Sequence, residues 1–153
     1  MIVVSDTSPI TALLTIGAAE LLAQLFGEVV IPAAVRDELL RSHPLLPPWL
    51  QIKTVQNPGQ VRQYAQIVDV GEAEAIELAR ELRADRLLMD ERKGRALAMR
   101  EGIPVIGLLG VVLLAKRRRL IPSARQLLQR LESESGIYLA VDIRETALKT
   151  VGE

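Results

Sequence analysis

The sequence predicts an α/β fold in which helices cover both faces of a central, mainly parallel sheet. Short apolar runs alternate along the chain with longer segments whose apolar residues recur at helical spacing. Runs such as IVV and RLLM are apolar without alternation, which is typical of parallel strands buried on both sides. The 153 residues show no shift in composition, so we expect a single three-layer α/β/α domain over 1–153.

The apolar runs and the turn residues between them place the elements in order. Strands are expected at 1–5, 28–31, 49–55, 86–90, 103–107 and 137–141. Helices are expected at 8–17, 19–26, 33–41, 60–67, 70–84, 91–101, 110–118, 123–132 and 142–151. Pro9 and Pro32 suit first helical turns, and Gly102 suits a helix end. Asp142 and Glu145 have the spacing of a capping box for the last helix.

The composition excludes several classes of site. The 19 basic and 19 acidic residues cancel, so net charge argues neither for nor against a nucleic-acid partner. The chain has no cysteine, which excludes disulfides and thiolate metal sites and fits a cytoplasmic protein. His43 is the only histidine, which excludes a zinc site with paired histidines, and no GxxxxGK[ST] phosphate loop occurs. Carboxylates are therefore the expected carriers of any chemistry.

No membrane association is expected from the sequence. The longest apolar stretch, 103–115, is too short to span a bilayer and contains a proline and two glycines. The N-terminus lacks the basic segment of a signal peptide, and Asp6 interrupts its first apolar run.

Two aspartates directly follow predicted strands. Asp6 follows MIVVS, and Asp90 follows RLLM. In sheets of this class, ligands bind outside the carboxyl ends of the strands, so both aspartates lie at the expected functional edge. Each also suits the N-cap of the helix that follows it, and Ser8 could equally cap the first helix.

Two glutamates lie on inward faces of predicted helices. Glu38 shares a face with Val35, and Glu72 shares a face with Ala75. For Glu38, the alternative is a boundary glutamate paired with an arginine. For Glu72, the alternative is a capping box with Asp69. Clustered carboxylates repel one another unless a divalent cation lies between them, and such sites hydrolyse phosphodiesters.

Two further acids are weaker candidates. Glu74 lies about 200° around its helix from Glu72, which predicts a solvated surface position. Glu91 ranks below its neighbour Asp90, because Asp90 fits the position at the end of the strand better. The sequence leaves open which of Glu72, Glu74 and Glu91 completes an acidic site.

The four leading acids resemble the acidic quartet of PIN-domain proteins in order and spacing. They are Asp6 in VVSDTSPI, Glu38 in VRDEL, Glu72 in GEAEAI and Asp90 in LLMDE. The likeness covers essentially the whole chain. The stretches DVGEAEAIELA, LLMDERKGRALA and IGLLGVVLLAKRR are similar to a prokaryotic PIN subfamily related to VapC-type ribonuclease toxins.

This resemblance implies a compact α/β/α domain that binds Mg²⁺ or Mn²⁺ and cleaves single-stranded RNA. It implies that the four acids carry the metal site and the catalysis. Thr7 or Ser8 would match the hydroxyl that often follows the first aspartate of the family. Glu72 stands where an aspartate is usual, which leaves its metal contact open. Homodimers are frequent in the family, and many members are held inactive by a cognate antitoxin protein.

Among the basic residues, Lys93 and Arg95 are candidates for contact with an RNA backbone, since they lie one turn beyond Asp90; the alternative is that both are solvated surface residues. The basic run 116–119 is interpreted as a solvated helix end. The aromatic content of 3% argues against a base-stacking platform.

Two competing functions are also considered. A phosphatase similar to the haloacid dehalogenases also begins with a strand and an aspartate, but it needs a second aspartate where this chain has Ser8. The other alternative is a catalytically inactive PIN-like module that binds RNA or a protein.

Overall fold

The core of the protein is a sheet of five strands, all of them parallel, in the order β3-β2-β1-β4-β5. The computed structural model describes all residues, 1–153. The strands are β1 (Val3–Ser5), β2 (Val29–Ile31), β3 (Leu50–Ile52), β4 (Arg86–Leu88) and β5 (Val105–Ile106). The first strand lies at the centre, where Val4 is in register with Val30 on one side and Leu87 on the other.

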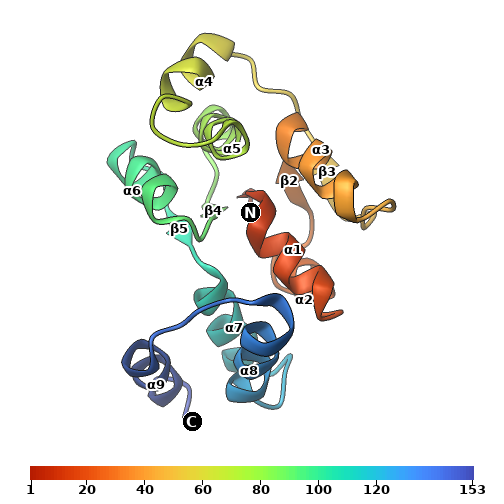
Figure 1. Cartoon of the computed structure of the whole chain (residues 1–153), viewed down its shortest axis with the longest axis vertical. Coiled ribbons are helices and arrows are strands. Elements are labelled where there is room, and N and C mark those ends of the chain that lie inside the picture. Colours follow the sequence, from red (N-terminus) through yellow and green to blue (C-terminus); the bar gives the residue numbers. More distant parts are fainter.

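Nine helices surround this sheet. They are α1 (Thr7–Thr15), α2 (Glu20–Phe26), α3 (Ala33–Ser42), α4 (Pro58–Tyr64), α5 (Val70–Leu82), α6 (Arg92–Arg100), α7 (Leu108–Arg117), α8 (Ala124–Ser135) and α9 (Val141–Lys149). Figure 1 shows α4, α5 and α6 gathered at one end of the molecule and α7, α8 and α9 at the other, with α1 between them.

The two faces of the sheet bury different apolar clusters. Because successive side chains of a strand point to opposite faces, Val3 and Leu88 join a cluster with α1, α2, α7 and α8. Val4 and Leu87 join the other cluster, with α4, α5 and α6. The clusters contain 24 and 16 buried residues, so both faces are covered. The predicted three-layer α/β/α architecture is confirmed.

The predicted last strand, 137–141, is wrong. This segment is an irregular connection from α8 to α9, and the sheet ends at β5. The apolar alternation that predicted a strand has another cause: Ile137 and Leu139 pack partly against the core, while Tyr138 is 85% exposed. The segment therefore has the alternation of covered and exposed side chains that is typical of a strand, but it pairs with no other strand.

The predicted capping box of the last helix is also wrong. Helix α9 begins at Val141 with Ala140 at its N-cap, and no side chain caps it. Glu145 instead accepts two hydrogen bonds from Arg125 of α8, at 2.8 and 2.9 Å. The Glu145 carboxylate, which a capping box would need, therefore joins α9 to α8 instead.

Two features of the fold bear on function. All strands end at the same edge of the sheet, so the residues that follow β1 and β4 are brought side by side. None of the helices combines the length and the apolar character that a membrane crossing requires.

Candidate functional site

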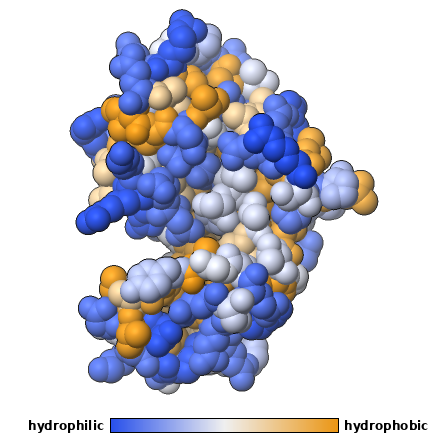
Figure 2. Space-filling view, in the orientation of Figure 1, coloured by the Kyte–Doolittle hydropathy of each residue, from blue (hydrophilic) through white to orange (hydrophobic).

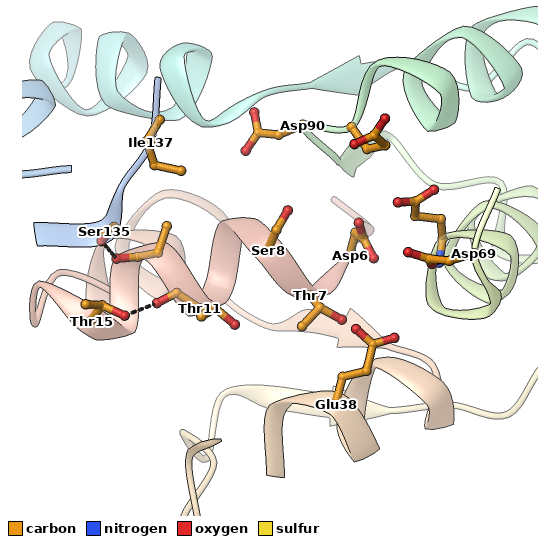
Figure 3. Close-up of a pocket in the computed structure, with 13 residues that line it drawn as sticks. Asp6, Thr7, Ser8, Thr11, Thr15, Glu38, Asp69, Asp90, Ser135 and Ile137 are labelled. Carbon is orange, nitrogen blue, oxygen red and sulfur yellow. Dashed lines mark hydrogen bonds between the residues drawn. The ribbon is translucent and has the colours of Figure 1, made fainter. Parts of the chain in front are cut away.

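A polar cleft of about 510 Å³ lies at the carboxyl edge of the sheet, over the ends of β1 and β4. Acids and hydroxyls dominate its lining: Asp6, Thr7, Ser8, Thr11, Ala12, Thr15, Glu38, Asp69, Glu72, Asp90, Glu91, Ser135 and Ile137. Figure 3 shows the carboxylates of Asp6, Glu38, Asp69 and Asp90 directed into this space from different elements. All four acids of the expected quartet therefore border one cleft.

Asp6 is held at the floor of this cleft by the sheet. Its backbone N–H donates to the Leu88 carbonyl at 2.9 Å, which extends the pairing of β1 and β4 by one residue. Its side chain does not cap α1, although Asp6 occupies the N-cap position. The residue is only 5% exposed, and burial raises the pKa of its carboxyl to about 7. The negative charges of Asp69, Glu38 and Asp90 raise this pKa further, and the Thr7 backbone amide lowers it.

Asp90 is oriented by a different helix from the one it was expected to cap. The N-cap of α6 is Glu91, so that alternative is wrong. The Asp90 Oδ1 atom accepts a hydrogen bond from the Leu108 backbone N–H, in the first turn of α7, at 2.8 Å. Desolvation by the cleft walls raises the pKa of Asp90, although the residue is exposed at the surface. The Leu108 amide and the Arg95 charge act in the opposite direction.

Glu72 enters the cleft from the first turn of α5. It is 8% exposed, and its backbone N–H donates to Asp69 Oδ1 at 2.8 Å. That bond is half of the capping box considered above, with Asp69 as the N-cap. Burial, followed by the charge of Asp69, raises the pKa of the Glu72 carboxyl to about 8.

Glu38 enters from α3 and lies against Gly71 of α5. It is half-buried, and its carboxylate makes no ion pair with an arginine, so the alternative of a paired boundary glutamate is wrong. The helix therefore presents an unpaired carboxylate to the cleft.

The residues present fit a hard divalent cation. Every donor is a carboxylate or hydroxyl oxygen, the ligand type that Mg²⁺ and Mn²⁺ prefer. The Thr7 Oγ1 atom is buried without a hydrogen-bond partner, and burial, with a further contribution from the neighbouring acids, raises the pKa values of Asp6 and Glu72. No three of the acids converge on a single point as the side chains stand.

Comparison with known families agrees with this geometry. The family model described as DUF3368, PIN domain, matches residues 2–153, almost the whole chain. The chain belongs to the PIN-domain family. PIN domains are generally metal-dependent nucleases that bind RNA and use divalent cations. No curated protein matches the chain.

One acid of this PIN domain was overlooked in the sequence. Asp69 lines the cleft, and it is the charged neighbour with the largest effect on the pKa of both Asp6 and Glu72. Its spacing from Glu72 indicated only a cap, which it also forms. A residue that caps the first turn of α5 lies at the same helix end as Glu72, and that is the signal that could have placed it in the cleft.

The weaker candidates separate clearly. Glu91 lines the cleft of the PIN domain, as Glu72 does. Glu74 does not, because its Oε1 accepts a hydrogen bond from the Ala34 backbone N–H at the start of α3, at 3.1 Å. It is therefore a partly buried helix cap and not the solvated acid that was expected.

Hydroxyls form a row on one wall of the cleft. Thr7, Thr11 and Thr15 recur at four-residue spacing on α1, beside Ser8, and Ser135 of α8 continues the wall. The four-residue spacing of these threonines in the sequence is the signal that could have predicted this row.

The basic residues differ in their relation to the cleft. Arg95 lines a neighbouring hollow, where its Nη1 donates to the Met89 carbonyl at 3.1 Å. Lys93 is exposed and lines neither space. The basic run ends α7, where Lys116 and Arg118 bond to the Pro122 and Leu25 carbonyls.

The neighbouring hollow is larger and mainly apolar. It measures about 810 Å³, and 11 of its 16 lining residues are hydrophobic. It shares Asp90 and Ile137 with the acidic cleft, and Tyr138 and Ile143 stand at its rim, 85% and 55% exposed. Figure 2 shows a notch in this face of the PIN domain, between the upper and lower groups of helices.

Proposed function

We propose that this PIN domain is a Mg²⁺- or Mn²⁺-dependent endoribonuclease that cleaves phosphodiester bonds of single-stranded RNA. The observation that carries the proposal is the cleft itself. Four acids border one open space: Asp6 and Asp90 follow β1 and β4, and Glu38 and Glu72 lie on α3 and α5. A family of metal-dependent nucleases supplies the reaction class.

In the proposed site, Asp6, Glu38, Glu72 and Asp90 hold the cation and act in catalysis. Asp6 is the central ligand, since it lies at the floor among the other acids and is the most deeply buried of the four. Asp69 adds negative charge beside Asp6 and Glu72. The row of carboxylates would repel a phosphate without a cation, so metal and substrate are expected to bind together.

The cleft residues would orient the RNA strand around the phosphate to be cut. Ser8 donates a hydrogen bond to a non-bridging phosphate oxygen, and Thr11 further along α1 offers a similar contact to the next phosphate. Thr7 lines the cleft beside them, and its buried Oγ1 would reach a phosphate only after its side chain turns. Arg95 is held by the Met89 carbonyl and keeps guanidinium N–H groups that no protein atom accepts. Arg95, with Lys93 at the periphery, is the proposed cationic contact to the backbone.

Bound in this cleft, Mg²⁺ or Mn²⁺ would supply a water of lowered pKa and would offset the charge that develops on the phosphate. A carboxylate of the cleft would accept the proton that the attacking water loses. As the new P–O bond forms, the P–O ester bond to the leaving nucleoside would break, and the leaving oxygen would take up a proton from solvent. Asp90, fixed by the Leu108 amide, keeps the acidic wall in place during this step.

We also infer that the protein acts in the cytoplasm as the toxin of a toxin-antitoxin pair, and that it forms a homodimer. The apolar hollow beside the cleft supports a protein partner, because its exposed rim residues have no cover in the isolated chain. A small antitoxin-like reading frame next to the gene, and growth arrest on expression that Asp6→Asn abolishes, are the expected signs of the toxin role.

The nuclease is tested with purified protein and a panel of single-stranded and folded RNAs, with Mg²⁺, Mn²⁺ or EDTA. We expect cleavage only with a cation, and a loss of at least about 10- to 100-fold in Asp6→Asn. The matched control is Asp37→Asn, which removes an exposed acid beside Glu38, outside the cleft. Metal-independent cleavage, or equal cleavage by Asp6→Asn, would contradict the nuclease. RNA binding without cleavage would favour the inactive binding module.

A further inference from the structure

Gly71 is a glycine that the backbone does not require. It is the second residue of α5, and its φ angle lies outside the left-handed region that favours glycine. Glycine inside a helix costs about 1 kcal/mol relative to alanine. Stability of the helix alone would therefore favour alanine at this position.

The space beside Gly71 supplies the reason for the glycine. A Cβ atom on residue 71 would overlap Oε1 of Glu38, and it would lie 3.3 Å from Cδ of the same carboxylate. It would also lie 3.5 Å from Asp69 Oδ1, an ordinary van der Waals contact. The side chain of an alanine would thus occupy the position of the Glu38 carboxylate while leaving Asp69 in place.

Nothing else in the protein fixes the Glu38 carboxylate. The carboxylate accepts no hydrogen bond from any protein group and forms no ion pair. Its position is therefore limited mainly by the close approach to Gly71 of α5. Because the Glu38 side chain is flexible, an added Cβ would be relieved by rotating the carboxylate away from α5. The acid would then leave the side of the cleft where Glu72 and Asp69 lie.

We propose that Gly71 is a positioning residue, whose missing side chain lets the Glu38 carboxylate lie against the first turn of α5 and complete the cation site. The inference rests on the proposed function, because it assigns Glu38 to that site. It explains why a glycine directly precedes Glu72 in the stretch VGEAEA. Gly71 acts through Glu38 and has no contact with substrate of its own.

The first test compares Gly71→Ala with Gly59→Ala in the full-length protein. Gly59 is also the second residue of a helix, α4, and a Cβ there would come no closer than 3.4 Å to a neighbour, Asn57 Oδ1. Mn²⁺ affinity is measured by titration calorimetry, together with cleavage of a fluorescent single-stranded RNA. Gly71→Ala is expected to bind Mn²⁺ about 10- to 100-fold more weakly, and Gly59→Ala to match the wild type.

The second test asks whether the loss acts through Glu38. Glu38→Asp withdraws the carboxylate by one methylene, so alone it is expected to weaken Mn²⁺ binding. In the Gly71→Ala background, the shorter side chain avoids the new Cβ, and the double variant is expected to bind Mn²⁺ more tightly than Gly71→Ala does. Such non-additivity is the signature of two residues in contact, and a purely structural role for Gly71 would not produce it.

The outcomes separate this inference from the proposed function. If the wild type neither binds Mn²⁺ nor cuts RNA, the proposed function fails and the inference fails with it. If the wild type does both and Gly71→Ala behaves like Gly59→Ala, or the double variant shows no recovery, the inference alone is overturned. Circular dichroism reports folding; if Gly71→Ala unfolds, recovery of its melting temperature by Glu38→Asp supports the overlap, and no recovery contradicts it.

Discussion

The Asp90 carboxylate accepts a hydrogen bond from the backbone amide of Leu108, at 2.8 Å, and so joins the end of β4 to the start of α7. The first prediction separates this structural bond from the proposed catalytic charge. Asp90→Asn keeps an acceptor oxygen for the amide, so its free energy of unfolding should change by less than about 0.5 kcal/mol. Asp90→Ala loses the bond and should be about 1 kcal/mol less stable. Both variants should lose RNA cleavage.

Urea unfolding and the RNA cleavage assay measure the two effects. Equal destabilisation by Asp90→Asn and Asp90→Ala would show that the Leu108 bond depends on the charge. Cleavage retained by Asp90→Asn would remove Asp90 from the proposed metal site.

The second prediction concerns pH. Burial raises the pKa of Asp6 from 3.8 to about 7 and that of Glu72 from 4.5 to about 8. The folded protein without metal therefore binds more protons than the unfolded chain between about pH 4 and pH 8. Its stability should be highest at the acid end of this window and should fall as pH rises through 7 and 8. Thermal melts in EDTA should show this fall.

In the same melts, the stabilisation by Mg²⁺ should increase with pH, whereas the stability of the metal-free protein decreases. Ionised carboxylates bind the cation, so Mg²⁺ should raise the melting temperature more at pH 8 than at pH 5. Asp6→Asn should flatten the EDTA profile. A melting temperature in EDTA that rises steadily from pH 5 to pH 8 would contradict the uncompensated charge in the cleft.

The third prediction distinguishes the two basic candidates. Arg95 borders the hollow beside Asp90 and is held by the Met89 carbonyl, whereas Lys93 projects from the surface of α6. Arg95→Met should weaken RNA binding and reduce the slope of log K against log salt by about 1, while Lys93→Met, at the periphery, should change both by less. Fluorescence anisotropy over a salt series measures this. An unchanged slope in Arg95→Met would show that Arg95 only supports the wall of the neighbouring hollow.

The fourth prediction concerns the apolar hollow. Ile143 is 55% exposed at its rim, far from the carboxylates in sequence, and a charge there should oppose burial by a protein partner. Ile143→Glu should shift the protein from dimer to monomer in sedimentation experiments. Asp142→Lys, an exposed neighbour that does not line the hollow, is the matched control. A wild type that sediments as a monomer would contradict the proposed homodimer.

Much of the fold could be predicted because it depends on local patterns. Short apolar segments marked the five strands, and helical spacing marked the helices, with ends displaced by a few residues. The segment 137–141 failed because alternation reports which side chains are covered and not whether a strand lies alongside. Glu77 shows the same limit: its spacing from Arg80 on α5 allows the two hydrogen bonds between them, but its complete burial depends on the packing of the layers around α5.

By itself, the sequence determined that acids follow β1 and β4 and lie on the inward faces of α3 and α5, because strand direction and helical periodicity are local. Only the tertiary structure decided how these acids are held. The packing of α3 on α5 brings Glu38 to Gly71, the start of α7 orients Asp90, and the N-cap Asp69 becomes part of the cleft. These contacts join residues 18 or more positions apart, so they follow from how the layers pack and not from any one segment.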